Sequence, residues 1–360
     1  MNKNHFSILF LSIFFICAAL AAITCTMPLD IDNFLNDSAV KGIINSTPPD
    51  NGGDEYDEII GSVDPTEELR QALSDYNGDG SRNNETWSLE VGNYDLQVWV
   101  DGKTLTLVGK NQDNVVIRGP SDYSTLTSFS VTDSDASGAV SNVIGLININ
   151  GGNVTLRNLS IEGNTTEFHS KQPALMAAPA ALAGIGIVGA TVVIENVTVN
   201  NIVGINGGTS SGAQRVYGIL AAGSSTNLTI RNSTITYFQK NGVHVLANVG
   251  NVYFTGNTVT GSAGNFTAAQ NGIVLFNGHA QIDNNTFSNF RWDKPDPVAV
   301  ATAILVWRDS NNIGFFDGTF QDNARSNNTF TNINNLWVTD NPGPLGQAQC
   351  HVLYGGLNPD

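Results

Sequence analysis

Short stretches in which apolar and polar residues alternate recur along the chain from about residue 104 onward. The repeated unit has six positions in order: an apolar residue, any residue, usually Asn, any residue, Thr or Ser, and a second apolar residue. It occurs at 156–161, 194–199, 230–235, 254–259 and 282–287, and more weakly at 325–330. Many copies are preceded by a Gly-led apolar element, as at 184–187 and 218–220. Alternation with a period of two residues predicts a chain of many short strands.

The third position of the repeat gives the length of one structural turn. Its residues are spaced 38, 36, 24, 28 and 43 apart, at Asn158, Asn196, Asn232, Gly256, Asn284 and Asn327. The shortest spacing leaves room for two or three strands but not for a crossover helix. We therefore expect a solenoid whose turns stack and whose strands pair in parallel. Asn suits the bend between strands because it tolerates left-handed backbone and its amide can bond to the Asn one turn away.

These repeats, with the opening segment 92–109, resemble the pectate-lyase-like family of right-handed parallel β-helices over roughly residues 89–334. The resemblance implies an all-β fold, a right-handed parallel β-helix. A short N-terminal helix is expected to cap its open end, because Asp64 suits an N-cap, Pro65 the first helical position and Glu67 a capping box. This fold carries lyases, hydrolases, esterases, adhesins and stalks, so it implies no single activity.

The chain is expected to divide into five parts. Residues 1–25 are typical of an export signal, since a charged start precedes an apolar run that ends in small residues. Cys25 lies where a lipoprotein cysteine would be, so we expect lipidation there; plain secretion and an uncleaved anchor are the alternatives. An acidic flexible tether (26–62), the cap helix with a turn (63–88), the β-helix (89–336) and a tail or cap (337–360) follow. The expected location is extracellular or in the cell envelope.

The formal charge of −16 is unevenly distributed. Residues 26–140 contain 21 acidic and 6 basic residues, whereas residues 165–336 contain 8 of each. No basic stripe is present to neutralise phosphates, which excludes nucleic acid as a partner. The neutral body also lacks a strong attraction for polyanionic glycans. A membrane is expected as a partner only through a lipid at Cys25.

The longest insertions all fall at one place in the repeat. In the resembled family the longest loops follow the third strand of each turn, and the insertions here (163–183, 201–216, 261–270 and 288–302) match that rule. Stacking would bring them to one side, which commonly marks a binding face, although surface loops also grow at little energetic cost. The outward residues of the strand beneath are expected to form a mostly apolar floor of Leu220, His244, Val274 and Leu305.

Several side chains near this face are candidates for a site. Aromatic rings stack on sugars and cations hold carboxylates, so the candidate binding residues are Tyr237, His244, Arg291, Trp292 and Trp307. For catalysis, Asp293 or Asp309 could act as acid or base, with Arg308 or Lys240 as the electropositive partner. The alternative is that these are solvated loop charges. The carboxylate, paired-Asp and Gln-Asp sets that the resemblance to lyases, hydrolases and esterases implies are not found.

One segment resembles the first half of a calcium loop. Asp75, Asn77 and Asp79 place oxygens at positions 1, 3 and 5, with Gly80 at position 6. Position 12 is Thr86 rather than a carboxylate. The alternative is a turn that joins the cap helix to the first strand. Calcium is the one cofactor that the sequence suggests.

The expected function is that of an exported, surface-anchored β-helix protein that binds glycan or another extracellular partner through its long-loop face. A polysaccharide lyase or glycoside hydrolase that uses the same face is one alternative. A structural surface protein without a defined ligand is another. Convergence of Asp293, Arg308, Asp309 and Lys240 in one groove would favour the enzyme.

Overall fold

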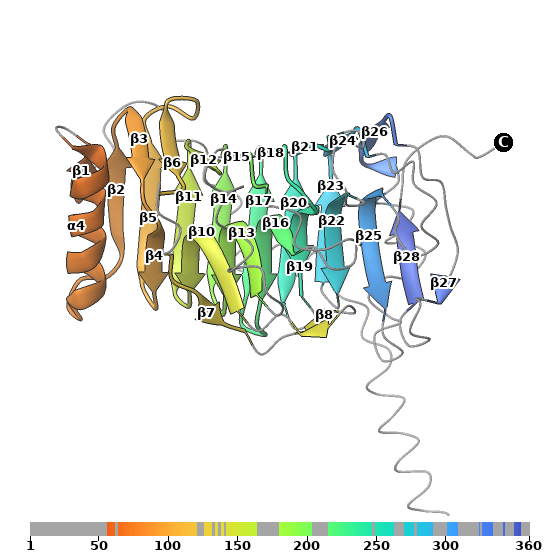
Figure 1. Ribbon diagram of the computed structural model, residues 1–360, viewed down its shortest axis with the longest axis horizontal. Helices are drawn as coiled ribbons and strands as arrows, with labels where there is room; N and C mark the ends of the chain where they lie inside the picture. The colour runs from red at the N-terminus through yellow and green to blue at the C-terminus, as the bar shows by residue number, and fades with distance from the viewer. Residues whose placement is uncertain are drawn as a thin grey trace, which may run out of the picture. The chain divides into compact units, whose positions relative to one another are not determined.

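The computed structural model describes residues 56–61, 64–120, 126–131, 134–135, 138–139, 142–163, 180–203, 215–246, 249–262, 270–276, 279–290, 301–308, 324, 326–333, 341–342 and 349–353. Within these residues, three long sheets are built from stacked turns that run from a helix at one end to the last strands at the other (Figure 1). Almost all strand pairs are parallel and join residues one turn apart. The predicted fold class, a right-handed parallel β-helix with a short N-terminal helix, is confirmed.

Each complete turn contributes one strand to each sheet. Sheet 1 contains β1 (Glu58–Ile60), β2 (Glu85–Leu89), β5 (Thr104–Gly109), β11 (Asn153–Arg157), β14 (Thr191–Glu195), β17 (Asn227–Arg231), β20 (Asn251–Thr255) and β23 (His279–Asp283). Sheet 2 contains β4 (Val98–Asp101), β10 (Asn142–Asn150), β13 (Ala180–Val188), β16 (Val216–Ala222), β19 (Asn241–Val245), β22 (Asn271–Phe276), β25 (Thr302–Arg308), β28 (Gln349–Leu353) and β27 (Asn341–Pro342), with β7 (Phe129–Ser130) paired to β10. Sheet 3 contains β3 (Gly92–Asp95), β6 (Val115–Arg118), β12 (Ser160–Glu162), β15 (Thr198–Asn200), β18 (Thr234–Thr236), β21 (Thr258–Thr260), β24 (Thr286–Ser288) and β26 (Thr329–Thr331). A separate antiparallel pair joins β8 (Ser134–Asp135) and β9 (Gly138–Ala139).

The apolar positions of the repeat form the core. In sheet 2, consecutive turns align Ile185, Ile219, Val243, Ile273 and Ile304 in one row. Each of these side chains is fully buried. Because strands alternate between faces, the same register sends the intervening residues outward. Any binding chemistry of the stack must therefore come from the outward positions and the connections.

The bend between sheets 1 and 3 has the predicted left-handed backbone. Asn158, Asn196, Asn232 and Asn284 have φ angles of 55°, 51°, 52° and 57°. The Nδ2 of Asn196 donates to the Oδ1 of Asn158 at 2.7 Å, which is the expected bond from one turn to the next. Gly256 takes the same bend with φ 68°.

A second ladder of amides lies inside the stack, one residue after the bend. The Nδ2 of Asn257 donates to the Oδ1 of Asn285 at 3.0 Å, and that of Asn285 donates to Asn328 at 2.8 Å. Each amide also donates to a backbone carbonyl of the preceding turn: Asn257 to Ile230 at 2.9 Å and Asn285 to Phe254 at 2.8 Å. Buried amides are tolerated here because their hydrogen bonds are made within the ladder.

The helix α4 (Pro65–Gly78) packs on the first turns as the capping sequence predicts. Asp64 is its N-cap and accepts a hydrogen bond from the backbone N–H of Glu67 at 3.0 Å. The helix buries Leu69, Leu73 and Tyr76 in the same core as the strands. It therefore covers the apolar interior at this end of the stack.

The predicted boundaries need one correction near residue 62. Ile59 and Ile60 lie in β1, which pairs in parallel with β2, so the folded region begins within the segment expected to be a tether. The side chain of Ile60 is 2% exposed, and its burial explains why this short segment joins the sheet. At the far end, β28 pairs antiparallel with β25. No helix in the described part of the chain is long and apolar enough to span a membrane.

Candidate functional site

The connections of this fold are strongly unequal in length. Two residues join β10 to β11 and two join β11 to β12, whereas the chain between β12 and β13 covers residues 163–179. Four further long connections, at 119–141, 201–215, 261–270 and 289–301, also run from a sheet 3 strand to a sheet 2 strand, whereas residues 309–328 join β25 of sheet 2 to β26 of sheet 3. The predicted insertions therefore all leave sheet 3 and enter sheet 2, and this edge of the stack is called the loop-bearing side below.

The strand floor on this side is aligned as predicted but it is not exposed. Leu220, His244, Val274 and Leu305 occupy one row of sheet 2. Their exposed fractions are 0%, 3%, 1% and 6%. The expectation of an exposed His244 is therefore wrong. Its ring stacks on Tyr217 with centroids 4.3 Å apart and lies 5.2 Å from the ring of Phe276, and this aromatic packing explains its burial.

Beside His244, buried polar side chains form hydrogen bonds with one another. The Nδ2 of Asn241 lies 2.8 Å from the Nδ1 of His244, and the Nδ2 of Asn271 donates to Asn241 at 3.0 Å. The hydroxyl of Thr302 donates to the Oδ1 of Asn271 at 2.9 Å. All four residues are at most 5% exposed. These hydrogen bonds therefore hold adjacent turns together, and the sequence did not reveal them because the strand pattern shows apolar alternation but not which polar side chains meet between turns.

The other predicted site residues fall into three groups. Tyr237 is 44% exposed, and Lys240 is half-buried at the start of β19. Trp307 and Arg308 belong to β25, where their backbones pair with β28. The remaining ones lie outside the described residues: Arg291, Trp292, Asp293, Asp309 and the lipidation candidate Cys25. Convergence of the catalytic candidates stays a prediction.

Each proposed calcium ligand makes a hydrogen bond within the protein. Asp75 and Asn77 lie within α4; the Oδ1 of Asp75 accepts from Gln71 at 2.8 Å, and the Nδ2 of Asn77 donates to the carbonyl of Trp99 at 2.7 Å. Asp79 accepts from the Ser81 hydroxyl at 2.7 Å, which lowers the pKa of its carboxyl. No group of three or more His, Cys, Asp or Glu side chains in the described ranges is placed to hold a metal ion. Calcium binding by these residues stays a prediction.

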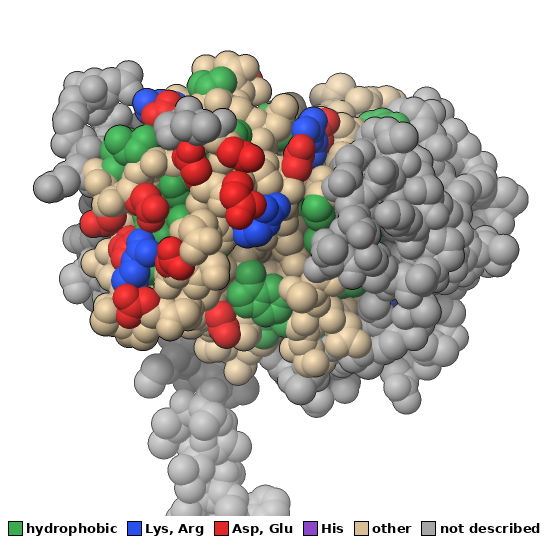
Figure 2. Space-filling model, turned by 60° about the vertical axis from the view of Figure 1, so that its left-hand side comes forward, with side chains coloured by type: hydrophobic (Ala, Val, Ile, Leu, Met, Phe, Trp, Pro, Cys, Tyr) green, Lys and Arg blue, Asp and Glu red, His purple; other side chains and the backbone are tan. Residues whose placement is uncertain are grey.

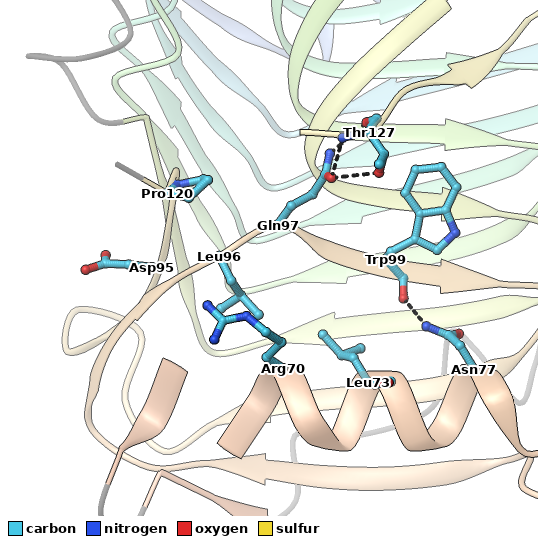
Figure 3. Close-up of a pocket in the computed structure, with 10 residues that line it drawn as sticks. Arg70, Leu73, Asn77, Asp95, Leu96, Gln97, Trp99, Pro120 and Thr127 are labelled. Atoms are coloured by element: carbon cyan, nitrogen blue, oxygen red, sulfur yellow. Dashed lines mark hydrogen bonds between the residues drawn. The ribbon is translucent and has the colours of Figure 1, made fainter. Parts of the chain in front are cut away.

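An open cavity of about 370 Å³ lies between α4 and the first turns. Arg70, Leu73, Ser74 and Asn77 line it from the helix, whereas Gln97 and Trp99 line it from the strand side (Figure 3). Pro120 and Thr127 contribute from the first long connection, 119–141. The cavity therefore belongs to the loop-bearing side, at its α4 end.

The cavity wall is held in place by specific contacts. The Oε1 of Gln97 accepts from the backbone N–H of Thr127 at 2.9 Å (Figure 3). Its Nε2 donates to the carbonyl of Gly145 at 2.7 Å. Trp99 meets the ring of Phe129 edge-on, with centroids 6.1 Å apart. Gln97 thus fixes the loop against the strand, and Trp99 is oriented by its neighbour.

Charge at this end is mostly negative. Asp and Glu side chains gather on the surface at the α4 end, with few Lys and Arg among them (Figure 2). The exposed acidic residues there include Asp64, Glu67, Asp75 and Asp79. Of the side chains that line the cavity, Asp95 alone is acidic, and Arg118 holds it at 2.6 and 2.9 Å. This contact raises the pKa of Arg118. The setting suits an uncharged ligand better than an anionic one.

Sequence reasoning missed this cavity because its walls come from three separate segments. One signal was available: in the strand Val98–Asp101, alternation places Trp99 on the outward face, whereas tryptophan is on average highly buried. Arg70 gave no comparable signal, since a basic residue on the polar side of a helix is ordinary.

The sheets and their connections define a right-handed parallel β-helix protein. Residues 217–344 match the family model described as a right handed beta helix region. Pectin methylesterase PemA from Erwinia chrysanthemi is 12% identical over 84% of this chain and 90% of that one, with a TM-score of 0.38. A pectin methylesterase in complex with hexasaccharide VII is 12% identical over 70% of this chain, with a TM-score of 0.37. This chain spans 61% of the length of that protein.

The rice weevil pectin methyl esterase is also 12% identical, over 87% of this chain and 96% of that one, with a TM-score of 0.31. No curated protein sequence matches the chain. These likenesses carry no argument about activity, because one fold carries many activities. The fold expected from the sequence is confirmed by the parallel sheets of this chain and by the matched beta helix region, and the activity has to be argued from the site.

Proposed function

We propose that this protein is an exported β-helix protein that binds an uncharged carbohydrate on its loop-bearing side, in the cavity beside Trp99. The observation that carries the proposal is the combination of an indole ring with a guanidinium and a hydroxyl, from Trp99, Arg70 and Ser74, around one open cavity. Its volume lies within the range of small-molecule sites, ~300–1,000 Å³.

The chemistry of the lining supports a sugar as the ligand. An indole face stacks on the apolar face of a pyranose ring, while planar donors such as guanidinium reach the hydroxyl groups at its edge. Arg70 is 52% exposed and pairs with Glu67 on the surface of the helix. Such a surface pair is worth little, so the Arg70 guanidinium is available to a ligand.

Binding rather than catalysis suits this cavity. Acid–base cleavage of a glycosidic bond generally uses a pair of carboxyl groups on either side of the bond. Here Asp95 is the one carboxylate in the lining, and its two oxygens are held by Arg118. The described cavity therefore provides recognition without an evident acid–base pair.

Export and a lipid anchor at Cys25 complete the proposal. They are supported by the apolar run in residues 1–25 and by the acidic, Pro- and Gly-containing segment that follows it. An anchored protein of this kind would present its loop-bearing side to extracellular glycans.

A binding assay with two variants tests the proposal. The purified protein is titrated with a panel of neutral and uronate-containing oligosaccharides. We expect Trp99→Ala to weaken the binding of a neutral oligosaccharide by at least about tenfold, because losing a central aromatic anchor costs ~2 kcal/mol or more. Tyr253→Ala removes an outward aromatic residue of sheet 1 and is the matched control. Absence of binding across the panel, or equal losses in both variants, would contradict the proposal.

A further inference from the structure

The outer face of sheet 3 carries a regular array of hydroxyl groups. Four consecutive strands read Thr-Ile-Thr, Thr-Val-Thr, Thr-Phe-Ser and Thr-Phe-Thr, at β18, β21, β24 and β26. In each strand the middle residue points into the stack and the two flanking residues point outward. The outward side chains are therefore seven threonines and one serine, in two rows of four.

Register pairing fixes the rows. One row aligns Thr234, Thr258, Thr286 and Thr329, and the other aligns Thr236, Thr260, Ser288 and Thr331. We call these eight residues the hydroxyl array. Thr258, Thr286, Thr329 and Thr331 are exposed, and the other four are half-buried. The array is thus exposed on β21, β24 and β26 and half-buried on β18.

The array has no formal charge and no aromatic ring, and this sets it apart from the other outer faces. The outer row of sheet 1 places Arg157, Glu195 and Arg231 side by side, with nitrogen–oxygen contacts of 3.2 and 2.9 Å. The outer row of sheet 2 is buried and carries His244 among its apolar residues. A face without aromatic rings or charged hydrogen-bonding groups lacks the features that usually hold a soluble sugar.

The geometry of the array is periodic and rigid. Parallel pairing repeats the hydroxyl groups every ~4.8 Å across the strands and every ~6.6 Å along them. Threonine is restricted at χ1, so its hydroxyl and methyl groups keep fixed directions. The hydroxyl groups of Thr260 and Ser288 lie 3.2 Å apart, within hydrogen-bond distance from one turn to the next. Such a face can hold a layer of water molecules in a repeating arrangement.

We propose that the hydroxyl array binds ice. Ice is an uncharged solid whose surface repeats hydrogen-bonding oxygens in two dimensions, at spacings close to those of the array. A formal charge would keep its own hydration shell and disturb that lattice, and the array has none. Pre-ordered side chains lose little entropy on binding, which favours a rigid surface over a flexible loop. This inference does not depend on the cavity beside Trp99.

The test measures ice binding directly. The purified protein is examined for thermal hysteresis, for faceting of a single ice crystal and for partition into slowly grown ice. Thr258→Lys and Thr286→Lys each put a charge and a long side chain into the array. Thr229→Lys makes the same change on the outer face of sheet 1 and serves as the control. Circular dichroism during heating checks that each variant is folded.

We expect the native protein and Thr229→Lys to facet ice and to partition into it. Each array variant should lose both effects while it keeps the native unfolding temperature. Absence of ice binding by the native protein overturns the proposal, as does an equal loss in the array variants and the control. Binding of the array to a neutral insoluble polysaccharide, without binding to ice, overturns it as well.

Discussion

Replacing Asn285 with Ala tests whether the interior amide ladder stabilises the stack. Asn285 is 1% exposed and lies in the middle of the ladder. Its Nδ2 donates to the carbonyl of Phe254 at 2.8 Å, and its Oδ1 accepts from the backbone N–H of Asn257 at 2.8 Å. Alanine removes both partners at a place that water does not reach.

The expected loss follows from these two backbone groups. An unsatisfied buried donor or acceptor costs ~1–3 kcal/mol, so two of them predict that Asn285→Ala lowers the free energy of unfolding by ~2–6 kcal/mol. The amides of Asn257 and Asn328 also lose a partner. Packing alone would predict much less, because removing a small polar side chain leaves only a small cavity.

Denaturant unfolding followed by circular dichroism measures this loss. The control is Asn284→Gly, the adjacent residue, which is exposed and has a φ of 57° that glycine adopts readily. We expect this control to change stability by no more than about 0.5 kcal/mol. Equal stability of the two variants would refute the idea that the buried amides hold the turns together.

Four further predictions concern other parts of the chain. Gly256→Ala should destabilise the protein by ~1–2 kcal/mol in thermal unfolding, because the residue has φ 68° and a Cβ would lie 2.6 Å from the amide oxygen of the Asn one turn earlier. The hydrogen bond from Arg82 lowers the pKa of Glu85. The stability that this contact contributes is therefore present above the unfolded pKa of ~4.3 and is lost as the pH falls through the folded pKa. Glu85→Gln should reduce this loss of stability in acid, which unfolding measured at several pH values would show. Incubation with neutral and uronate-containing polysaccharides should release neither unsaturated uronate nor reducing ends, and turnover that Arg308→Ala abolishes would make the protein an enzyme. Cys25→Ser should prevent incorporation of labelled palmitate and move the protein out of the membrane fraction, whereas unchanged labelling would exclude Cys25 as the lipid site.

Much of the fold could be predicted because the repeat determines both the backbone conformation at the bend and the length of one turn. The Asn at the bend, as at Asn196, needs left-handed backbone, and the short spacing between copies forces the turns to stack. The strand β1 could not be predicted, since Glu58–Ile60 is too short to show alternation and is held by pairing with β2. The interior amide ladder could not be predicted either, because Asn257 and Asn285 occupy a position at which other copies of the repeat have different residues.

The candidate site was less predictable than the fold. The loop-bearing side follows from where the insertions lie in the repeat, so it could be predicted. The burial of His244 could not, because alternation shows that a side chain points outward but not whether other side chains cover it. The cavity beside Trp99 joins a helix, a strand and a loop that are distant in sequence, and it exists only once α4 packs against the first turns.

Stacking makes the inward positions uniform and leaves the outward positions free to diverge. Each inward residue contacts its equivalents in neighbouring turns, so a substitution there disturbs the packing of several turns. Outward residues differ from face to face: sheet 1 carries a row of Arg and Glu, sheet 2 a buried row that includes His244, and sheet 3 the hydroxyl array. Because Trp99 and Thr258 lie on different sheets, Trp99→Ala should leave ice binding unchanged and Thr258→Lys should leave oligosaccharide binding unchanged. A loss of both activities in either variant would point to one shared surface or to global unfolding, and the thermal unfolding curves would distinguish these two explanations.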